Sequence, residues 1–476
     1  MTLAGVARAA AAREGFQPDF GSDVEREIAA LQPVPPPPGT QDLRRLPWSS
    51  IDNVESRDLD QVEYAEAAER GGIRLRIGIA DVDAYVPLDS AVDMHARTNA
   101  TSLYTGVAIF PMLPEKLSAG LTSLLPDQDR LALVVEITVN EDGTVTGGDI
   151  YRAVVRNAAK MAYESVGAWL EGGGSTEGVP AAMSDQLRLQ AEASRRLKAE
   201  RQRAGALEFE TIEARPVTKD GHVVDLAVTR KNRARDLIED FMIAANIATS
   251  KFLERSGSSG IRRVVRRPER WPRIVDLVRG HGGSLPPEPD SHALAAFLAQ
   301  ARAKDPLRFP DLSLAIVKLL GRGEYALDLP GKDPGGHFGL AADDYSHATA
   351  PNRRYADLIQ QRLVKAVLAK GASSPPYNNE ELATLAAHCT EREDAAQKVE
   401  RFMRKVAAAD LLGHRIGQSF DAIVTGVTPK GTYVRLLRPP AEGRVVRNEQ
   451  GMDVGDRVRV TLVHVDPDRG FIDFSG

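Results

Sequence analysis

Strand-like and helix-like stretches follow one another along this chain without regular alternation, and this order constrains the fold most. Residues Ile73–Val86 alternate apolar and polar side chains and Leu131–Val139 is rich in β-branched residues, so both are predicted strands. The turn residues 140–143 predict a hairpin into a strand over Thr144–Tyr151. Helical spacing dominates later, over Leu187–Gln202, Asp236–Glu254, Ser291–Ala303, Ala356–Lys370 and Glu380–Leu412. Because these elements do not repeat as βα units, the α+β class is favoured.

The two ends of the chain differ from its middle. Residues 3–14 and 22–31 predict two short helices, the second starting in a Ser22–Glu25 capping box, and the proline run 33–39 predicts a stiff extended linker. Short strand candidates between Gly, Pro and Asp turns are typical of a five-stranded OB-type β-barrel; they are Phe420–Val427, Gly431–Leu436, Gly443–Val446, Asp456–Val465 and Phe471–Phe474. We expect a short helical region over 1–40, a mixed sheet surrounded by helices over 41–412, and a barrel over 415–476.

Composition excludes several classes of protein. The single cysteine, Cys389, excludes a disulfide within the chain and any Cys-based metal site. No run of eighteen uncharged apolar residues predicts a membrane span, and arginines interrupt the apolar N-terminus, so we expect a cytoplasmic protein. A net charge of -5 argues against a uniformly basic nucleic-acid binder. The arginine-rich run 262–273, which contains Trp271, is either a local nucleic-acid surface or a solvated face.

Three aspartates, Asp52, Asp58 and Asp60, lie within nine residues. Asp58 and Asp60 are two apart, so on a strand they face the same side, and a loop after Asp52 would let all three converge. Converging carboxylates repel one another unless a cation lies between them, and oxygen ligands without His or Cys favour Mg²⁺ or Mn²⁺. The alternative is a polar surface loop.

Two adjacent arginines, Arg353 and Arg354, follow Pro351 and come just before a predicted helix. Guanidinium groups near a helix N-terminus are suited to grip a phosphate. The alternative is an ordinary surface pair neutralised by Asp357.

Considered together, these segments change that balance. Five segments of the chain resemble successive motifs of the RNB catalytic domain, the domain of the RNase II and RNase R exoribonucleases. In chain order, these segments are Leu43–Gln61, Ile77–Val86, Phe110–Leu117, Ile238–Asn246 and Tyr345–Leu358. Residues 417–474 resemble the ribosomal S-one type of OB fold that ends RNase II proteins. Residues 16–31 resemble the helical segment that precedes the RNB domain.

The resemblance implies a processive 3′→5′ exoribonuclease that degrades single-stranded RNA to nucleoside 5′-monophosphates with Mg²⁺, for which Mn²⁺ is a possible substitute. Asp52, Asp58 and Asp60 match three of the family's four active-site aspartates, which hold metal ions that activate water. Asp60 matches the position on which cleavage depends most, with Asp58 beside it. Arg353 matches the catalytic arginine that neutralises charge on the scissile phosphate.

Other residues match RNA-binding positions of the family. Tyr104 and Phe209 match aromatics that stack on bases, with a core aromatic as the alternative for each. Tyr163 and Glu239 resemble the pair that senses the ribose 2′-hydroxyl, and Glu391 resembles a glutamate near the terminal base; the alternative is an ordinary helix face. Arg354 is the remaining candidate for RNA contact.

The chain also departs from the family's pattern. Gln61 stands where a fourth aspartate is common; its amide oxygen can still ligate Mg²⁺ but carries no charge, so metal affinity should fall or one of two metals be lost. Ala350 and Asn352 replace the commoner residues around Pro351. About forty residues precede the RNB-like region, too few for the family's two cold-shock domains, so we expect a more open RNA channel.

Three functions therefore compete. The leading one is an active metal-dependent exoribonuclease. The second is an RNA-binding protein, weakened or inactive as an enzyme because of Gln61. A DNA-directed nuclease is the third, and Tyr163 and Glu239 argue against it if they contact the 2′-hydroxyl. The resemblance suggests a monomer, and the sequence indicates neither a membrane nor a protein partner.

Overall fold

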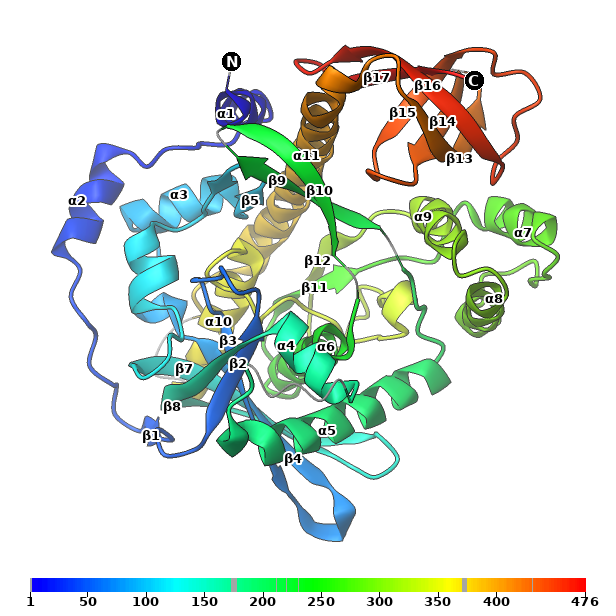
Figure 1. The fold of residues 1–476 in the computed structure, drawn as a ribbon. Coiled ribbons are helices and arrows are strands. Elements are labelled where there is room, and N and C mark those ends of the chain that lie inside the picture. The colour runs from blue at the N-terminus through cyan, green and yellow to red at the C-terminus, as the bar shows by residue number, and fades with distance from the viewer. Residues whose placement is uncertain are drawn as a thin grey trace.

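A mixed sheet with helices around it lies toward one end of the molecule, and a β-barrel formed by the C-terminal residues lies at the other end (Figure 1). The computed structural model describes residues 2–172, 178–210, 212–219, 221–229, 231–369, 375–429 and 431–476. The predicted α+β class is confirmed. No helix among the described residues is long and apolar enough to span a membrane.

The central sheet has the strand order β1-β8-β2-β3-β4-β7. Its strands are β1 (Gln41–Asp42), β2 (Trp48–Asp52), β3 (Gln61–Ala67), β4 (Ile73–Ala80), β7 (Asp129–Val139) and β8 (Val145–Ala162). Because β7 pairs with both β4 and β8, the five larger strands form a ring of pairings, to which β1 adds along β8. The long strand β8 pairs antiparallel with β7 and then parallel with β2.

Two predicted strands have different ends in the structure. β4 stops at Ala80 rather than Val86, because the Asp81 carboxylate accepts the Ala84 N–H and starts a 3-10 turn. β8 continues beyond Tyr151 to Ala162, since every second residue from Ala153 to Met161 is buried.

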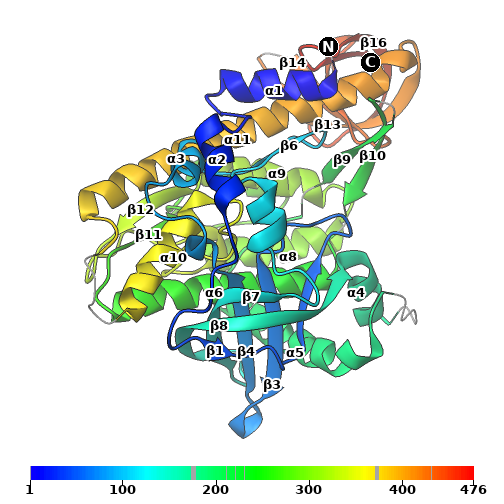
Figure 2. The ribbon, with the colours of Figure 1, turned by 90° about the vertical axis from the view of Figure 1, so that its left-hand side faces the viewer.

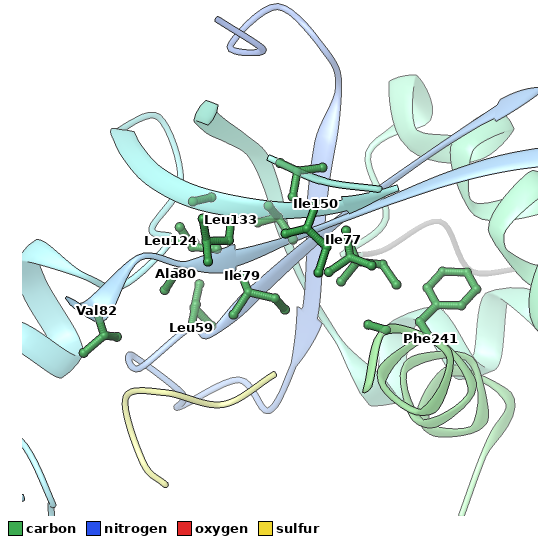
Figure 3. Packing of buried hydrophobic residues seen from close by; sticks show 14 of the residues in the cluster. Leu59, Ile77, Ile79, Ala80, Val82, Leu124, Leu133, Ile150 and Phe241 are labelled. Atoms are coloured by element: carbon green, nitrogen blue, oxygen red, sulfur yellow. The ribbon is translucent and has the colours of Figure 1, made fainter. Parts of the chain in front are cut away.

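The sheet encloses a hydrophobic core that also anchors the loop between β2 and β3 through Leu59. Figure 3 shows Leu59, Ile77, Ile79 and Leu133 packed together, with Phe241 of helix α6 (Arg233–Arg255) facing the sheet. Leu59 is 1% exposed. Because Leu59 is fixed in this core, the position of the neighbouring Asp60 is fixed as well.

Five helices follow the predicted spans closely. They are α5 (Ser184–Arg203), α6, α8 (Ser291–Lys304), α10 (Tyr355–Leu368) and α11 (Asn379–Leu412). Lys370, the predicted end of α10, lies outside the described residues. Helix α11 begins in a capping box between Asn378 and Glu381 and runs unbroken for 34 residues to the barrel (Figure 1).

The remaining elements complete the surroundings of the sheet. The helices are α1 (Leu3–Arg13), α2 (Ser22–Ala30), α3 (Ala91–Asn99), α4 (Tyr163–Leu170), α7 (Trp271–Gly280) and α9 (Phe309–Leu320). The short paired strands are β5 (Leu103–Tyr104) with β6 (Ile109–Phe110), β9 (Glu213–Lys219) with β10 (His222–Thr229), and β11 (Gly260–Val264) with β12 (Glu324–Asp328). Figure 2 shows α1 lying along α11, against which it buries Val6 and Ala10.

One expectation about local structure is wrong. Helix α2 has Gly21 as its N-cap, without a side-chain cap, so Ser22 and Glu25 form no capping box.

The run 262–273 is divided between buried and exposed residues, and four of its arginines are exposed: Arg266, Arg267, Arg270 and Arg273. Trp271 is 1% exposed and donates its indole N–H to the Pro286 carbonyl, while Arg262 is buried in ion pairs with Asp328 and Asp344.

The C-terminal part is a closed five-stranded barrel with the order β13-β14-β15-β17-β16, as predicted for an OB-type fold. Its strands are β13 (Ser419–Thr428), β14 (Gly431–Leu436), β15 (Glu442–Arg447), β16 (Arg457–Asp466) and β17 (Phe471–Ser475). Arg435 of the barrel forms two hydrogen bonds with Asp311 of α9, the shorter one 2.7 Å long. The barrel is thus joined to the helical part both by α11 and by an ion pair.

Candidate active site

The aspartate segment is the loop between the end of β2 and the start of β3. The Ser123 hydroxyl accepts the Leu59 N–H and donates to the Arg57 carbonyl, so it holds the loop at both positions. Lys160 of β8 donates to the carbonyls of Val54, at 2.8 Å, and Ser56. Two residues from elsewhere in the chain, Ser123 and Lys160, therefore hold this polar loop in place.

Asp60 lies in the middle of the candidate site. Its side chain is 2% exposed, and its carboxylate accepts the Asn352 N–H at 2.9 Å and faces the Arg353 guanidinium at 3.3 Å. Burial raises the pKa of Asp60 to about 7, and the Arg353 charge opposes this rise. The aspartate motif and the arginine motif therefore meet here.

The two adjacent arginines have different surroundings. The Arg353 side chain is 46% exposed and points its guanidinium at Asp60. Arg354 makes two 2.8 Å hydrogen bonds to Asp357, which is fully buried. For Arg354 the structure therefore favours the ordinary ion pair over a free phosphate ligand, whereas Arg353 is available to a substrate.

Tyr104 belongs to the same site. Its hydroxyl donates to Asp58 at 3.1 Å, and the side chain remains 38% exposed. The backbone preceding it is joined to the arginine segment, because the Ser102 N–H donates to the Arg353 carbonyl at 2.9 Å. An exposed ring fixed beside the aspartates is suited to stack on a base.

The charges of the acidic side chains affect one another's pKa values. The charge of Asp58 acts on Asp60, and the charge of Asp52 acts on Glu63 of β3. Burial raises the pKa of Glu63 well above its ordinary value, and Asp52 raises it further.

The donor types fit a hard divalent cation, because three aspartates, a glutamate and the Gln61 amide all offer oxygen. Glu63 in particular is a buried carboxylate without a hydrogen-bond partner among the described residues. No three His, Cys, Asp or Glu side chains of the described residues are already arranged around one point.

The predicted ribose-sensing residues lie on two helices, Tyr163 at the start of α4 and Glu239 in α6. The Arg235 guanidinium stacks over the Tyr163 ring at 4.2 Å from its centroid, and it also reaches Asn53 at 3.3 Å. Glu239 is one helical turn beyond Arg235, but its carboxylate pairs with Lys231 at 2.9 Å. Burial raises the pKa of Tyr163, and the negative charge of Asp52 raises it further, which relates Tyr163 to the aspartate segment.

Phe209 and Glu239 line one cavity of about 320 Å³ between α5, α6 and α9. Asp52, Asp58, Asp60 and Tyr104 do not line this cavity. Glu391 is exposed on α11, and its carboxylate lies 3.5 Å from Arg392. Of the predicted RNA-binding residues, the structure thus brings Tyr104 and Tyr163 to the aspartates, and it places Phe209, Glu239 and Glu391 in other surroundings.

Three residues of the site carried no assigned role in the sequence analysis. Glu63 follows the aspartate motif directly, and Arg235 is one of many arginines. Asn246 ends a quoted motif, and its side-chain oxygen accepts the Ala348 N–H at 2.8 Å, which holds the segment leading to Arg353. No local signal distinguishes Glu63, because β3 also contains Gln61 and Glu66.

Two family models match the chain: the RNB domain over residues 40–370, and the RNase II-type exonuclease C-terminal S1 domain over residues 418–475. The chain belongs to the RNB domain family.

Relatives of known name and structure agree with this assignment. Ribonuclease R of Escherichia coli (strain K12) is 32% identical over 492 residues, which cover 95% of this chain and 59% of the relative. The chain thus spans about three fifths of that relative's length. Mycoplasma genitalium RNase R, solved in complex with ribose-methylated single-stranded RNA, has a TM-score of 0.89 at 22% identity and covers 100% of this chain and 78% of its own.

One relative in structure is not an active nuclease. Yeast Ssd1, described as a pseudonuclease, has a TM-score of 0.72 at 17% identity, covering 97% of this chain and 58% of its own. At such identities the likeness establishes the fold alone. The fold is therefore compatible with both an active and an inactive protein, and the decision rests on the site.

Proposed function

We propose that this chain hydrolyses single-stranded RNA processively from the 3′ end and releases nucleoside 5′-monophosphates. The observation that carries the proposal is the buried Asp60, held between the Asn352 N–H and the Arg353 guanidinium beside Asp58 and Tyr104. A carboxylate placed against an exposed cation is an arrangement suited to phosphoryl transfer. Residues 41–412 carry the chemistry and the barrel over 415–476 helps to hold the RNA.

The cofactor in this proposal is Mg²⁺, with Mn²⁺ as a substitute, bound by Asp52, Asp58, Asp60 and Gln61. When bound, a divalent cation lowers the pKa of water and stabilises charge on the phosphoryl oxygens. In this proposal Arg353 neutralises charge on the scissile phosphate, Tyr104 stacks on a base near the 3′ end, and Tyr163 is the candidate that reads the ribose. Glu239, Phe209, Arg354 and Glu391 remain weaker candidates for RNA contact, because each has a protein partner or lies apart from the aspartates.

The decisive experiment is a time course on 5′-labelled poly(A) RNA with Mg²⁺, Mn²⁺ or EDTA, beside Asp60→Asn. The amide retains an oxygen that can accept the Asn352 N–H, so the fold should survive the substitution. We expect metal-dependent shortening to a small 5′ core and a loss of about 10³-fold or more in the variant. A 2′-deoxy strand of the same length should stay intact if the enzyme is specific for RNA.

A weakened or inactive RNA-binding protein is the second candidate. Gln61 brings no charge to the metal, and no three acidic side chains of the described residues already surround one point. Intact RNA in every lane together with a clear gel shift would favour this candidate and contradict hydrolysis.

A further inference from the structure

Ile109 lies next to Tyr104 at the candidate site. The two residues are direct partners in the antiparallel pairing of β5 with β6, so their side chains project from the same face of the hairpin, with β-carbons about 5 Å apart. The other face of the hairpin is turned inward, because Leu103 is 1% exposed. Ile109 therefore shares its face with the ring whose hydroxyl donates to Asp58.

This face of the hairpin is apolar and open. The Ile109 residue is 62% exposed and Tyr104 is 38% exposed. A single exposed aliphatic side chain is ordinary on a protein surface. Here, however, an aliphatic side chain and an aromatic ring are adjacent, and they lie beside the aspartate loop, whose side chains are mostly polar. An apolar surface in such a place is suited to the faces of nucleobases.

The hairpin holds this face in a fixed position. Its turn is closed because the Thr105 N–H donates to the Ala108 carbonyl at 3.0 Å and the Thr105 hydroxyl accepts the Ala108 N–H at 3.0 Å. At the base of the hairpin, the Ser102 N–H donates to the Arg353 carbonyl, and the Ser102 hydroxyl accepts the Met112 N–H at 2.9 Å. A surface that is already fixed loses little conformational entropy when a ligand packs on it.

We propose that Ile109 is a second base-packing residue, which contacts the nucleotide on the 5′ side of the one that Tyr104 stacks on. The inference rests on the proposed function and adds to it a residue outside the family-matched segments. The order of the two bases follows from the reach of the two side chains. Tyr104 extends to Asp58, whereas the shorter isoleucine side chain ends further from the aspartates, at which the 3′ end is cut.

The test measures binding of a 5′-labelled oligoadenylate to the full-length protein in an Asp60→Asn background, so that the RNA is not cut. Ile109→Ser should weaken affinity about tenfold, because the complex loses a buried aliphatic surface. Ile109→Val retains most of that surface and should stay within about threefold of the background. The control is Val145→Ser, which changes an exposed valine at the opposite end of β8 from Ala162, the residue that pairs with Asp52, and should bind like the background.

Abasic oligoadenylates identify the base that Ile109 contacts. Each strand lacks one base, at successive positions counted from the 3′ end. Loss of the base on Ile109 should weaken binding to the background protein, but should cost at most about twofold more in Ile109→Ser, because the two changes remove the same contact. Loss of the next base on the 3′ side, which Tyr104 contacts, should weaken binding to both proteins.

Thermal unfolding of each variant separates a lost contact from a damaged fold. We expect the Tm of Ile109→Ser to stay close to that of the background, because the side chain is exposed. If the Tm falls, Ile109→Thr takes its place, since threonine keeps the β-branching that suits a strand. Its hydroxyl still replaces an aliphatic group, so it should bind RNA more weakly than Ile109→Val does.

An affinity of Ile109→Ser within about twofold of the background would overturn the inference. An abasic profile that is the same with and without the isoleucine would also overturn it. Neither result bears on hydrolysis, which the wild type shows or does not show on poly(A) RNA in a separate assay. A wild type that leaves poly(A) RNA intact would remove the proposed hydrolysis, and the binding comparison would still decide whether Ile109 contacts a base.

Discussion

The Nε of Arg353 lies 3.3 Å from a carboxylate oxygen of Asp60, although 293 residues separate the two along the chain. Neighbouring interactions reinforce this contact, because the Asn352 N–H binds the other oxygen of Asp60 and the Ser102 N–H binds the Arg353 carbonyl. The relative position of the carboxylate and the guanidinium is thus set by backbone as well as side-chain hydrogen bonds. Substitutions at this junction should separate chemistry from folding.

Replacing Arg353 by methionine should mainly lower the rate of hydrolysis, whereas replacing Arg354 by methionine should mainly lower stability. Arg353→Met removes a half-exposed cation, so we expect hydrolysis to fall about 10²-fold or more with little change in Tm. Arg354→Met leaves the fully buried Asp357 without its cation, which should cost about 3–5 kcal/mol of unfolding free energy. Single-turnover rates and urea unfolding of both variants check this. Equal loss of rate without loss of stability in Arg354→Met would place Arg354 on the RNA instead.

Tyr104 should act through its ring rather than its hydroxyl. In an Asp60→Asn background that does not cleave, Tyr104→Ala should weaken binding of a short oligoadenylate, because loss of one base-stacking partner costs about 1–3 kcal/mol. Tyr104→Phe keeps the ring and loses only the hydrogen bond to Asp58, so its affinity should stay close to that of the background. Fluorescence anisotropy measures both. If Tyr104→Phe binds as weakly as Tyr104→Ala, the hydroxyl is the important group.

Lys160 should position the aspartate loop without touching RNA. Its ammonium group donates to the carbonyls of Val54 and Ser56, so Lys160→Met should loosen the loop and lower kcat more than RNA affinity. We expect a loss of about tenfold in kcat, and faster amide hydrogen exchange over residues 53–58. A variant with unchanged exchange but weakened RNA binding would show that Lys160 contacts the substrate.

Stability should depend on pH through Asp240 of α6. Burial raises the pKa of Asp240 to about 6, against the opposing charges of Arg201 and Lys198 on α5 and with the Glu239 carboxylate adding to the rise. A folded-state pKa above the unfolded value means that this contribution to stability is fully present at low pH and is lost as pH rises through about 6.

Between pH 5 and pH 7.5 the unfolding free energy contributed by Asp240 should fall by about 1–1.5 kcal/mol. Asp240→Asn cannot ionise, so its unfolding free energy relative to wild type should increase by that amount over the same interval. Urea titrations of the two proteins at the two pH values measure the difference. Parallel pH dependences would contradict the shift.

The sequence predicted the elements whose pattern is local. Helical spacing located α5, α6 and α11 to within a few residues, and the turn residues located the five barrel strands. What failed depended on neighbours far away in the chain. The run 262–273 reads as an exposed basic face, but β12 and the segment before Arg353 supply the acids that bury Arg262.

The sequence also predicted only part of the candidate site. The motifs identified Asp58, Asp60, Arg353 and Tyr104, which the structure brings together. They offered an ion pair with Asp357 as one alternative for the arginines, but the burial of Asp357, which the structure shows, could not be read from the sequence. The placement of Phe209 in a separate cavity depends on how α9 packs, which no local pattern reveals.

The distance along the chain between Asp60 and Arg353 also bears on how the protein is made. During synthesis the aspartate segment leaves the ribosome long before its partners, and about 290 further residues must follow before Arg353 exists. Contacts between such distant segments form late and slowly, because a long loop has to close first. A nascent or truncated chain that ends before position 353 would therefore carry the acidic half of the candidate site with no guanidinium opposite it, so the candidate site would be complete only when most of the domain has been translated.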